Sequence, residues 1–161
     1  MTRRDMLLGF SGCAIGALVA GLAGTAADAG TFEVTLSDAE WRKRLDPQAY
    51  AILRRQATER AFTSPLNREH RPGIFVCKGC ALPLFSAMTK FDSGTGWPSF
   101  WRPLPNAVRT SVDHDLGHIR TEVHCRRCGG HLGHVFDDGP RPTGLRYCMN
   151  GGALRFVPSQ A

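Results

Sequence analysis

Two pairs of cysteines constrain what this 161-residue chain can fold into more than any other feature. Cys77 and Cys80 enclose two residues, and so do Cys125 and Cys128. This gap lets both thiolates of a pair bind one metal ion, and four thiolates in a tetrahedral arrangement select zinc and leave no coordination position open for chemistry. Because 44 residues (81–124) separate the pairs, we expect them on two hairpins that the ion joins. The sequence therefore predicts one structural Zn²⁺ as the cofactor, with these four cysteines as its ligands.

The first 29 residues indicate an export signal rather than a part of the fold. Arg3-Arg4 precede a weakly apolar stretch rich in Gly and Ala, which ends in Ala27-Asp28-Ala29, a small-x-small cleavage site. Paired arginines before such a stretch are typical of the twin-arginine class, which exports folded proteins. We therefore expect residues 1–29 to be an export signal, residues 30–161 to form the working domain, and the protein to be exported to the periplasm.

Alternatives remain open for both the N-terminus and the cysteines. Phe10-Ser11-Gly12-Cys13 could be a lipoprotein cleavage box, and an uncleaved signal would also anchor the chain in a membrane. Of the six cysteines, removal of Cys13 leaves five, and an odd number in an exported protein means that at least one thiol is in no internal disulfide. The pairs could form disulfides in an oxidising compartment, or one CxxC could be a redox motif. Small residues after each pair, Ala81 and Gly129-Gly130, allow tight turns around bound thiolates and favour zinc.

Cap residues and hydrophobic periodicity place two helices before a series of strands. Ser37 and Glu40 form a capping box that predicts a short helix to about Leu45. Asp46-Pro47 repeats the signal and predicts a second helix to about Thr58. The period then changes to two, and strands are expected at Gly73–Cys77, Ala107–Val112, His118–Val123, His134–Phe136 and Ala153–Val157.

The composition agrees with a compact β-rich domain. Hydrophobic residues make up 42% of the chain and charged residues 21%, as in ordinary globular proteins, and 18 Gly and 10 Pro favour turns over a helix bundle. The net charge of +6 comes from scattered basic residues with no stripe of interleaved aromatic residues, so no nucleic-acid partner is expected. We predict a mainly β fold with short N-terminal helices and an antiparallel β domain, in a monomeric protein.

Three further segments concentrate residues that a zinc-bound scaffold does not need. Gly94–Trp101 holds aromatic rings on a loop with Gly and Pro, which suits an apolar recognition surface. His131–Asp138 offers two imidazoles that exchange protons near neutral pH, with carboxylates close by to orient them. Gly144–Gly152 carries Cys148, a thiol outside both pairs, between a guanidinium and an amide. Each segment could be purely structural, but together they supply a thiol, an acid–base pair and an aromatic pocket.

These motifs together resemble the type B methionine sulfoxide reductases, which act on the R epimer. The resemblance rests on GTGWPSFW, the two CxxC pairs, HLGHVFDDGPRPTG and LRYCMN, and it extends from about Ser37 to Phe156. It implies the family's pair of twisted antiparallel sheets, joined by the zinc site. It also implies a thiol-dependent oxidoreductase that repairs methionine-R-sulfoxide in oxidised proteins.

The resemblance assigns the chemistry to three residues. Cys148 would be the nucleophile that attacks the sulfoxide sulfur and is left as a sulfenic acid. His134 would supply protons to the departing oxygen, with His131 in support. A guanidinium near the thiol should favour the thiolate, and a histidine that titrates near its ordinary pKa of about 6.5 suits proton transfer at neutral pH.

The resemblance also assigns a substrate pocket. The Trp97 ring would hold the terminal methyl group of the substrate. Asn150 and Arg146 would complete the polar wall of the pocket, and Asp138 would hold the network of histidines and arginine in place.

The chain departs from the family's pattern at Thr95. Many members carry a second, resolving cysteine at this glycine-bounded position, and threonine cannot form a disulfide. If zinc holds the other four thiols, the reductant must be an external thiol, from a thioredoxin-like protein or a small molecule. A smaller departure is Asn150-Gly151, where the family usually has Asn-Ser.

Two other function classes remain open on the sequence alone. A zinc-stapled binding module would explain the four paired cysteines and the positive charge, but not Cys148, Trp97 or the His-Leu-Gly-His segment. A thiol–disulfide oxidoreductase would need a free CxxC in a thioredoxin-like βαβ context, which the sequence pattern does not offer.

Overall fold

The computed structural model describes residues 32–114, 117 and 119–160. The predicted export signal lies outside these residues. Among the helices of the described part, none combines the length and the apolar character that crossing a bilayer requires.

Two short helices begin where their cap residues predict. Helix α1 is Asp38–Arg44, and the capping box at its start is complete, because Ser37 and Glu40 each bond the other's backbone amide. Helix α2 is Pro47–Arg55, with the Asp46 side chain accepting from a backbone amide of the first turn. It ends three residues earlier than predicted, because Gln56 takes a left-handed conformation with φ of 56° and turns the chain away.

A three-stranded antiparallel sheet has the order β2-β1-β9. Its strands are β1 (Gly73–Cys77), β2 (Pro83–Ser86) and β9 (Leu154–Pro158), and in the middle strand Phe75 pairs with Phe85 on one side and Phe156 on the other.

A six-stranded antiparallel sheet has the order β3-β4-β8-β7-β6-β5. Its strands are β3 (Lys90–Phe91), β4 (Ser99–Phe100), β5 (Val108–Asp113), β6 (Arg120–Cys125), β7 (His131–Phe136) and β8 (Arg146–Met149). Three 3₁₀ turns, Pro65–Arg68, Ala87–Thr89 and η4 (Gly151–Ala153), join other elements. The five predicted strands are present with bounds shifted by up to three residues. Strands β2, β3, β4 and β8 were not predicted, because two to four residues show no alternation.

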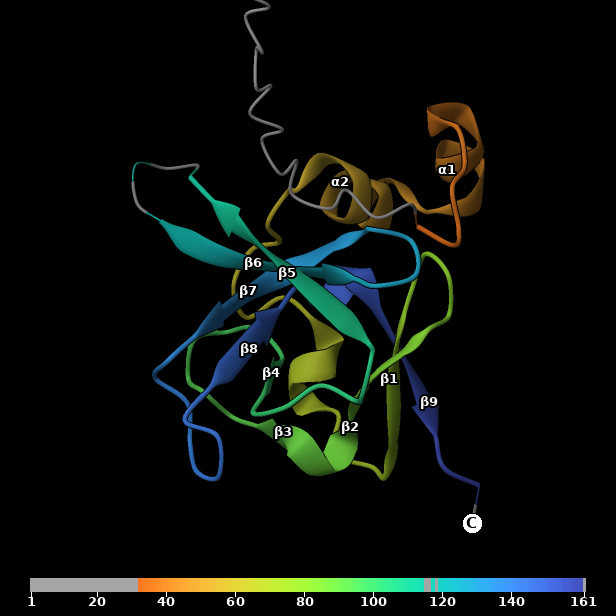
Figure 1. Cartoon of the computed structure of the whole chain (residues 1–161). Coiled ribbons are helices and arrows are strands. Elements are labelled where there is room, and N and C mark those ends of the chain that lie inside the picture. The colour runs from red at the N-terminus through yellow and green to blue at the C-terminus, as the bar shows by residue number, and fades with distance from the viewer. Residues whose placement is uncertain (1–31, 115–116, 118, 161) are drawn as a thin grey trace, which may run out of the picture. The chain divides into compact units, whose positions relative to one another are not determined.

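The two sheets meet through a cluster of aromatic rings. Phe100 of the large sheet stacks on Phe85 with 4.4 Å between ring centroids, and contacts the edge of Phe75 at 5.0 Å. All three rings are fully buried. Figure 1 shows the small sheet (β1, β2, β9) beside the large one and the helices next to β5–β7. The predicted fold class, mainly β with two antiparallel sheets and short N-terminal helices, is confirmed.

Candidate functional site

Strand pairing places two of the predicted chemical residues, Cys148 and His134, on one face of the large sheet. Cys148 on β8 pairs with Ser99 on β4 and with His134 on β7, and His134 pairs in turn with Glu122 on β6. Residues that pair directly across antiparallel strands project from the same face, with Cβ atoms about 4.5–5.5 Å apart. A row of side chains from three segments distant in sequence therefore surrounds the thiol.

The Cys148 thiol lies in a partly exposed position, whereas the four paired cysteines are buried. Burial raises the pKa of this thiol above its ordinary value, although Thr95, Arg146 and Ser99 each act to lower it. The Arg146 guanidinium therefore favours the thiolate, as expected, but burial of the thiol outweighs its effect on the pKa. The resting site holds a thiol at neutral pH, and an ionising partner is needed.

Each of the two imidazoles has its own carboxylate. His134 Nε2 lies 2.7 Å from Asp113 Oδ2, and His131 Nδ1 lies 2.7 Å from Glu122 Oε1. Burial lowers the pKa of His134 below its ordinary value, with Arg120 and His131 adding to the effect and Asp113 opposing it. His134 is therefore a neutral base at physiological pH, with a pKa below the expected value near 6.5.

A polar cavity of about 210 Å³ opens beside this histidine pair. It is lined by Gln56, Thr58, Asp113, Arg120, Glu122, His131 and His134. Asp113 and Glu122 were missed by the sequence reasoning, which looked for carboxylates next to the histidines in the chain. The pairing of β5, β6 and β7 supplies them, and only the alternation of β6 could have marked Glu122 as facing the site.

Arg146 and Asp138 form a pair on the same side as the thiol. Arg146 Nε donates to Asp138 Oδ1 at 2.8 Å, and Arg146 Nη2 donates to Asp138 Oδ2 at 2.9 Å. The guanidinium carbon of Arg146 lies 4.3 Å from the centroid of the ring of Phe136, its direct strand partner on β7. Asp138 thus orients the arginine as expected, but the histidines are held by Asp113 and Glu122 instead.

Trp97 and Asn150 are both anchored by Glu59, a residue that the sequence did not suggest. Trp97 Nε1 donates to the Glu59 carbonyl at 3.0 Å, and the Glu59 amide donates to Asn150 Oδ1 at 2.9 Å. The Glu59 side chain is 7% exposed, and its carboxylate accepts from the Gly151 and Gly152 amides that follow Asn150. Gly151 leaves room for Ser64 here, because a Cβ at this position would come within 1.9 Å of Ser64 Oγ and displace that side chain. No local pattern marks Glu59.

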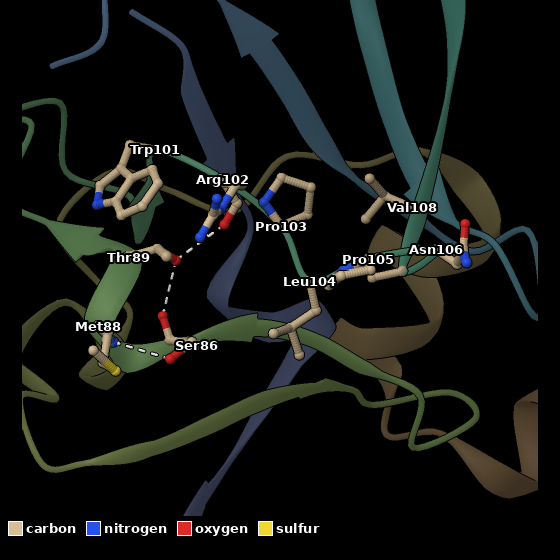
Figure 2. Close-up of a pocket in the computed structure, with 11 residues that line it drawn as sticks. Ser86, Met88, Thr89, Trp101, Arg102, Pro103, Leu104, Pro105, Asn106 and Val108 are labelled. Carbon is tan, nitrogen blue, oxygen red and sulfur yellow. Dashed lines mark hydrogen bonds between the residues drawn. The ribbon is translucent and has the colours of Figure 1, made fainter. Parts of the chain in front are cut away.

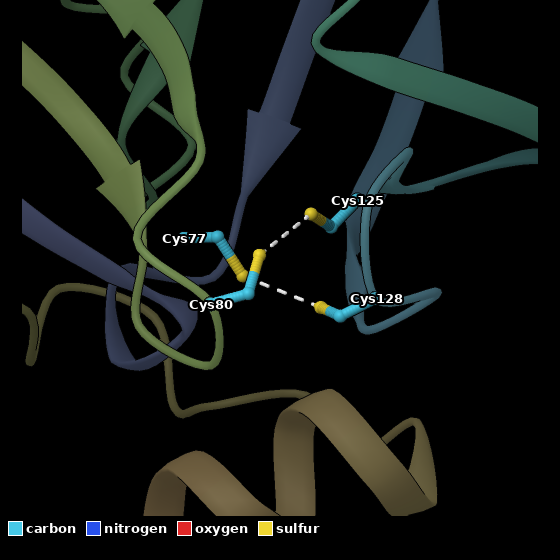
Figure 3. Close-up of side chains that lie close together, drawn as sticks. All are labelled: Cys77, Cys80, Cys125 and Cys128. Carbon is cyan, nitrogen blue, oxygen red and sulfur yellow. Dashed lines mark hydrogen bonds between the residues drawn. The ribbon is translucent and has the colours of Figure 1, made fainter. Parts of the chain in front are cut away.

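The four paired cysteines converge from the ends of β1 and β6 (Figure 3). Cys77 Sγ lies 3.7 Å from Cys128 Sγ, Cys80 Sγ lies 3.5 Å from Cys125 Sγ, and all four sulfurs lie within 4.8 Å of one another. Zinc–sulfur bonds of about 2.3 Å in a tetrahedron put the sulfurs about 3.8 Å apart. A disulfide requires about 2.05 Å. The described geometry therefore fits a four-thiolate metal site.

Both CxxC turns have the same backbone form. Ala81 and Gly129, which directly follow the pairs, take left-handed φ values of 60° and 66°, and each donates its amide to the carbonyl of the first cysteine. Leu53 of α2 lies over both turns, since a Cβ on Gly79 or Gly130 would come 3.5 Å or 2.8 Å from its methyl groups. Helix α2 thus covers the four-cysteine cluster from outside.

Sequence comparison decides the family. Residues 45–158 match the model of the SelR domain. The chain belongs to the SelR-domain family. Among its relatives, the "Peptide methionine sulfoxide reductase MsrB" of Leptospira interrogans is 52% identical over 126 residues, covering 78% of this chain and 96% of the relative. The protein of the same name from Thiobacillus denitrificans is 55% identical over 123 residues (76% and 93%). The chloroplastic "Peptide methionine sulfoxide reductase B1" of Arabidopsis thaliana is 53% identical over 122 residues (75% and 60%).

Thr95, at the position where the motif resemblance would place a resolving cysteine, lies beside Cys148 in this SelR domain. Its Oγ1 lies 3.8 Å from Cys148 Sγ. The structure therefore puts a hydroxyl where a second thiol would be able to reach the first.

The SelR domain also carries a larger cavity, of about 580 Å³, between the 101–108 segment and the end of β2 (Figure 2). Its lining includes Met88, Trp101, Pro103 and Leu104, and no residue that was predicted for the site. Thr89 Oγ1 lies 2.9 Å from the Ser86 carbonyl and 3.0 Å from the Arg102 carbonyl, and its single hydrogen can be donated to either.

Proposed function

We propose that this protein is a peptide-methionine (R)-S-oxide reductase, which reduces methionine-R-sulfoxide in oxidised proteins to methionine. The observation that carries the proposal is the row in which Cys148 lies between Ser99 and the carboxylate-held His134. The names of the relatives support methionine sulfoxide as the substrate. Preference for the R epimer and for protein-bound substrate rests on the resemblance of the motifs.

The reaction uses the thiol and the imidazole as a pair. His134, held at Nε2 by Asp113, takes the Cys148 proton at its other ring nitrogen and returns it to the sulfoxide oxygen. The thiolate attacks the sulfoxide sulfur and forms a transient sulfur–sulfur bond. This bond and the sulfur–oxygen bond of the substrate then break as the protonated oxygen passes to Cys148, where a new sulfur–oxygen bond forms. The methionine sulfur gains two electrons and the Cys148 sulfur loses two, so the products are methionine and a sulfenic acid.

The pocket residues orient the substrate around this thiol. Trp97, half-buried and anchored through its indole nitrogen, offers a ring against which the methyl group packs. Arg146 and Asn150 supply polar groups on either side of Cys148 along the chain. Their rigidity comes from Asp138 and Glu59, which hold them by hydrogen bonds.

The four paired cysteines would hold one structural Zn²⁺, which joins the two sheets and takes no part in the chemistry. With those thiols bound and Thr95 beside Cys148, the sulfenic acid is reduced by an external thiol, from a thioredoxin-like protein or a small molecule. One thiol displaces the oxygen as water and forms a mixed disulfide, and a second thiol releases Cys148.

The site of action would be the periplasm, reached through an N-terminal export signal at residues 1–29. Oxidised exported proteins would then be the substrates. N-terminal sequencing of the protein from fractionated cells tests this part. A chain beginning at Gly30 in the periplasmic fraction supports it, and retention of the full chain in the membrane fraction favours an anchored form.

The activity is tested with dithiothreitol and each epimer of a methionine sulfoxide derivative. Reduction of the R epimer alone supports the proposal, and reduction of the S epimer alone contradicts it. The external-thiol step is tested by mass spectrometry of the substrate-oxidised protein. We expect Cys148 as a sulfenic acid in the wild type, and a disulfide between positions 95 and 148 in Thr95→Cys, because the side chain at position 95 lies against Cys148, 3.8 Å from its sulfur, and a rotation of the new thiol could bring the two sulfurs together. An internal disulfide of Cys148 in the wild type would contradict the external-thiol step.

A further inference from the structure

Three hydroxyl groups lead through the protein to the Cys148 sulfur. Ser99 Oγ lies 2.8 Å from Ser93 Oγ, Ser93 Oγ lies 2.8 Å from Thr95 Oγ1, and Thr95 Oγ1 lies 3.8 Å from Cys148 Sγ. Ser99 is fully buried, and it is also the direct strand partner of Cys148. The chain of hydroxyls therefore begins and ends beside the same thiol.

The chain has a definite direction while Cys148 is protonated. Each hydroxyl has one hydrogen to donate and can accept on its oxygen. Ser99 donates to the Trp97 carbonyl at 3.1 Å, and a carbonyl can only accept. Ser93 then donates to Ser99, Thr95 donates to Ser93, and the Cys148 thiol donates to Thr95. Every hydrogen has an acceptor, so this arrangement suits the neutral thiol.

Loss of the thiol proton changes what Thr95 must do. A thiolate can only accept hydrogen bonds, so the Thr95 hydroxyl has to turn its hydrogen from Ser93 towards the sulfur. Ser93 loses one donor by this rotation, but it keeps the Thr95 backbone amide, which lies 3.4 Å from Ser93 Oγ. One rotation about a single bond thus converts the chain from a form that suits the thiol into one that suits the thiolate.

We propose that Thr95 is a further catalytic residue, whose hydroxyl donates a hydrogen bond to the Cys148 thiolate, and that Ser93 and Ser99 are positioning residues that hold it there. The proposal rests on the proposed function for its place in catalysis, but not for its effect on the thiol. Hydrogen bonds to an ionised group are stronger than those to its neutral form, so such a donor favours ionisation. Thr95 and Ser99 both lower the pKa of Cys148 against the effect of burial.

The 3.8 Å contact is long, as is common before a substrate is bound. The other groups that face Cys148 are the Arg146 guanidinium on its own strand, the His134 imidazole on β7 and the Ser99 hydroxyl on β4. Ser99 already donates to the Trp97 carbonyl, so Thr95 is the hydroxyl that is able to turn towards the sulfur. Threonine at this position is therefore more than the absence of a resolving cysteine, because it gives the thiolate a donor that a cysteine would supply only weakly.

The test is the pH dependence of Cys148 alkylation by iodoacetamide in the full chain, followed by mass spectrometry of the peptide that contains Cys148. Thr95→Val keeps the shape of the side chain and removes the hydroxyl. We expect its Cys148 pKa to rise by about 0.5–1 unit, so that alkylation at pH 7 slows about 3- to 10-fold. Thr95→Ser should restore the wild-type titration, and Ser93→Ala should raise the pKa by less than Thr95→Val.

Thr110→Val is the matched control, since Thr110 lies on the exposed edge strand β5 and pairs with Val123, away from the row of the site. It should leave the titration unchanged. The proposal is overturned if Thr95→Val titrates like the wild type, or if Thr95→Ser is shifted as far as Thr95→Val. Because alkylation reads the thiolate directly, a shifted titration in a protein that reduces no sulfoxide would sink the proposed function and leave this proposal standing.

Discussion

The two cysteine sites of this protein place the same side chain in opposite surroundings. In the four-cysteine cluster the sulfurs face one another at 3.5–3.7 Å, are buried, and lie on turns covered by helix α2. Cys148 faces a hydroxyl, an imidazole and a guanidinium, and it is partly exposed. The neighbours, rather than the thiol itself, decide whether a cysteine binds a metal or carries out chemistry.

The comparison predicts that each site fails in its own way. Loss of a cluster cysteine should damage the fold, and loss of Cys148 should damage only the reaction.

Cys148→Ser should lower kcat/KM for methionine-R-sulfoxide by at least about 10³-fold, because the alcohol is a far weaker nucleophile than the thiolate. Zinc content and the thermal unfolding temperature should stay as in the wild type, since the residue is not in the cluster. The measurement is a dithiothreitol-driven assay beside metal analysis of the same sample. Activity near the wild-type level would mean that the thiol site has been placed wrongly.

Cys125→Ser should have the reverse outcome. We expect zinc to fall from about one per chain to well below that, and the free energy of unfolding to fall by at least about 3 kcal/mol, because the binding energy of a structural zinc is folding energy. Calorimetry and metal analysis follow the two effects. If zinc stays stoichiometric and the unfolding temperature is unchanged, the cluster does not join the sheets through a metal.

The two cysteine sites also differ in how much of each could be predicted from the sequence. The cluster ligands could be assigned because two residues separate the members of each pair, and a local spacing is visible in one dimension. The thiol site depends on pairing between β4, β8, β7, β6 and β5, so its motifs could be recognised but Asp113, Glu122 and Glu59 could not. Strand β8 itself, which carries Cys148, was missed because four residues with mixed burial show no period.

Asp113→Asn tests the imidazole beside Cys148. In the wild type, kcat/KM should rise through the pKa of His134, which burial lowers below its ordinary value, and reach a plateau that lasts until Cys148 itself ionises, at a pKa that burial raises above the ordinary thiol value. Asp113 raises the pKa of His134, so its loss should move the acid limb to lower pH. A weaker base should also lower the plateau about 10- to 100-fold. Asp137→Asn, which changes an exposed carboxylate near Asp138, is the control and should keep the wild-type profile.

The lowered pKa of His134 also makes the stability of the folded protein depend on pH. Because the folded protein binds a proton at His134 less readily than the unfolded chain does, this histidine favours folding above pH 6.5 and opposes it as the pH falls below that value. Asp113→Asn should therefore lose more stability than the wild type between pH 7 and pH 5, as urea titrations at the two pH values would show. An equal loss in both proteins would argue that Asp113 and His134 are not coupled.

Glu59→Gln should give the smallest effect, and it separates binding from chemistry at the thiol site. Glutamine keeps the shape but turns one acceptor oxygen into a donor, so one of the Gly151 and Gly152 amides loses its partner. We expect the free energy of unfolding to fall by about 1–3 kcal/mol. The KM for methionine-R-sulfoxide should rise about 3- to 10-fold with little change in kcat.

KM is expected to change because the backbone of Glu59 holds Trp97 and Asn150, which would contact the substrate in the proposed function, and does not touch the Cys148 sulfur. Glu40→Gln provides the comparison, since it weakens the cap of helix α1 far along the chain and should cost stability without changing KM. If Glu59→Gln lowers kcat and leaves KM alone, then the turn after Cys148 aims the thiol rather than the pocket. That outcome would make the rigidity of the thiol site depend, like that of the cluster, on the turn that follows its cysteine.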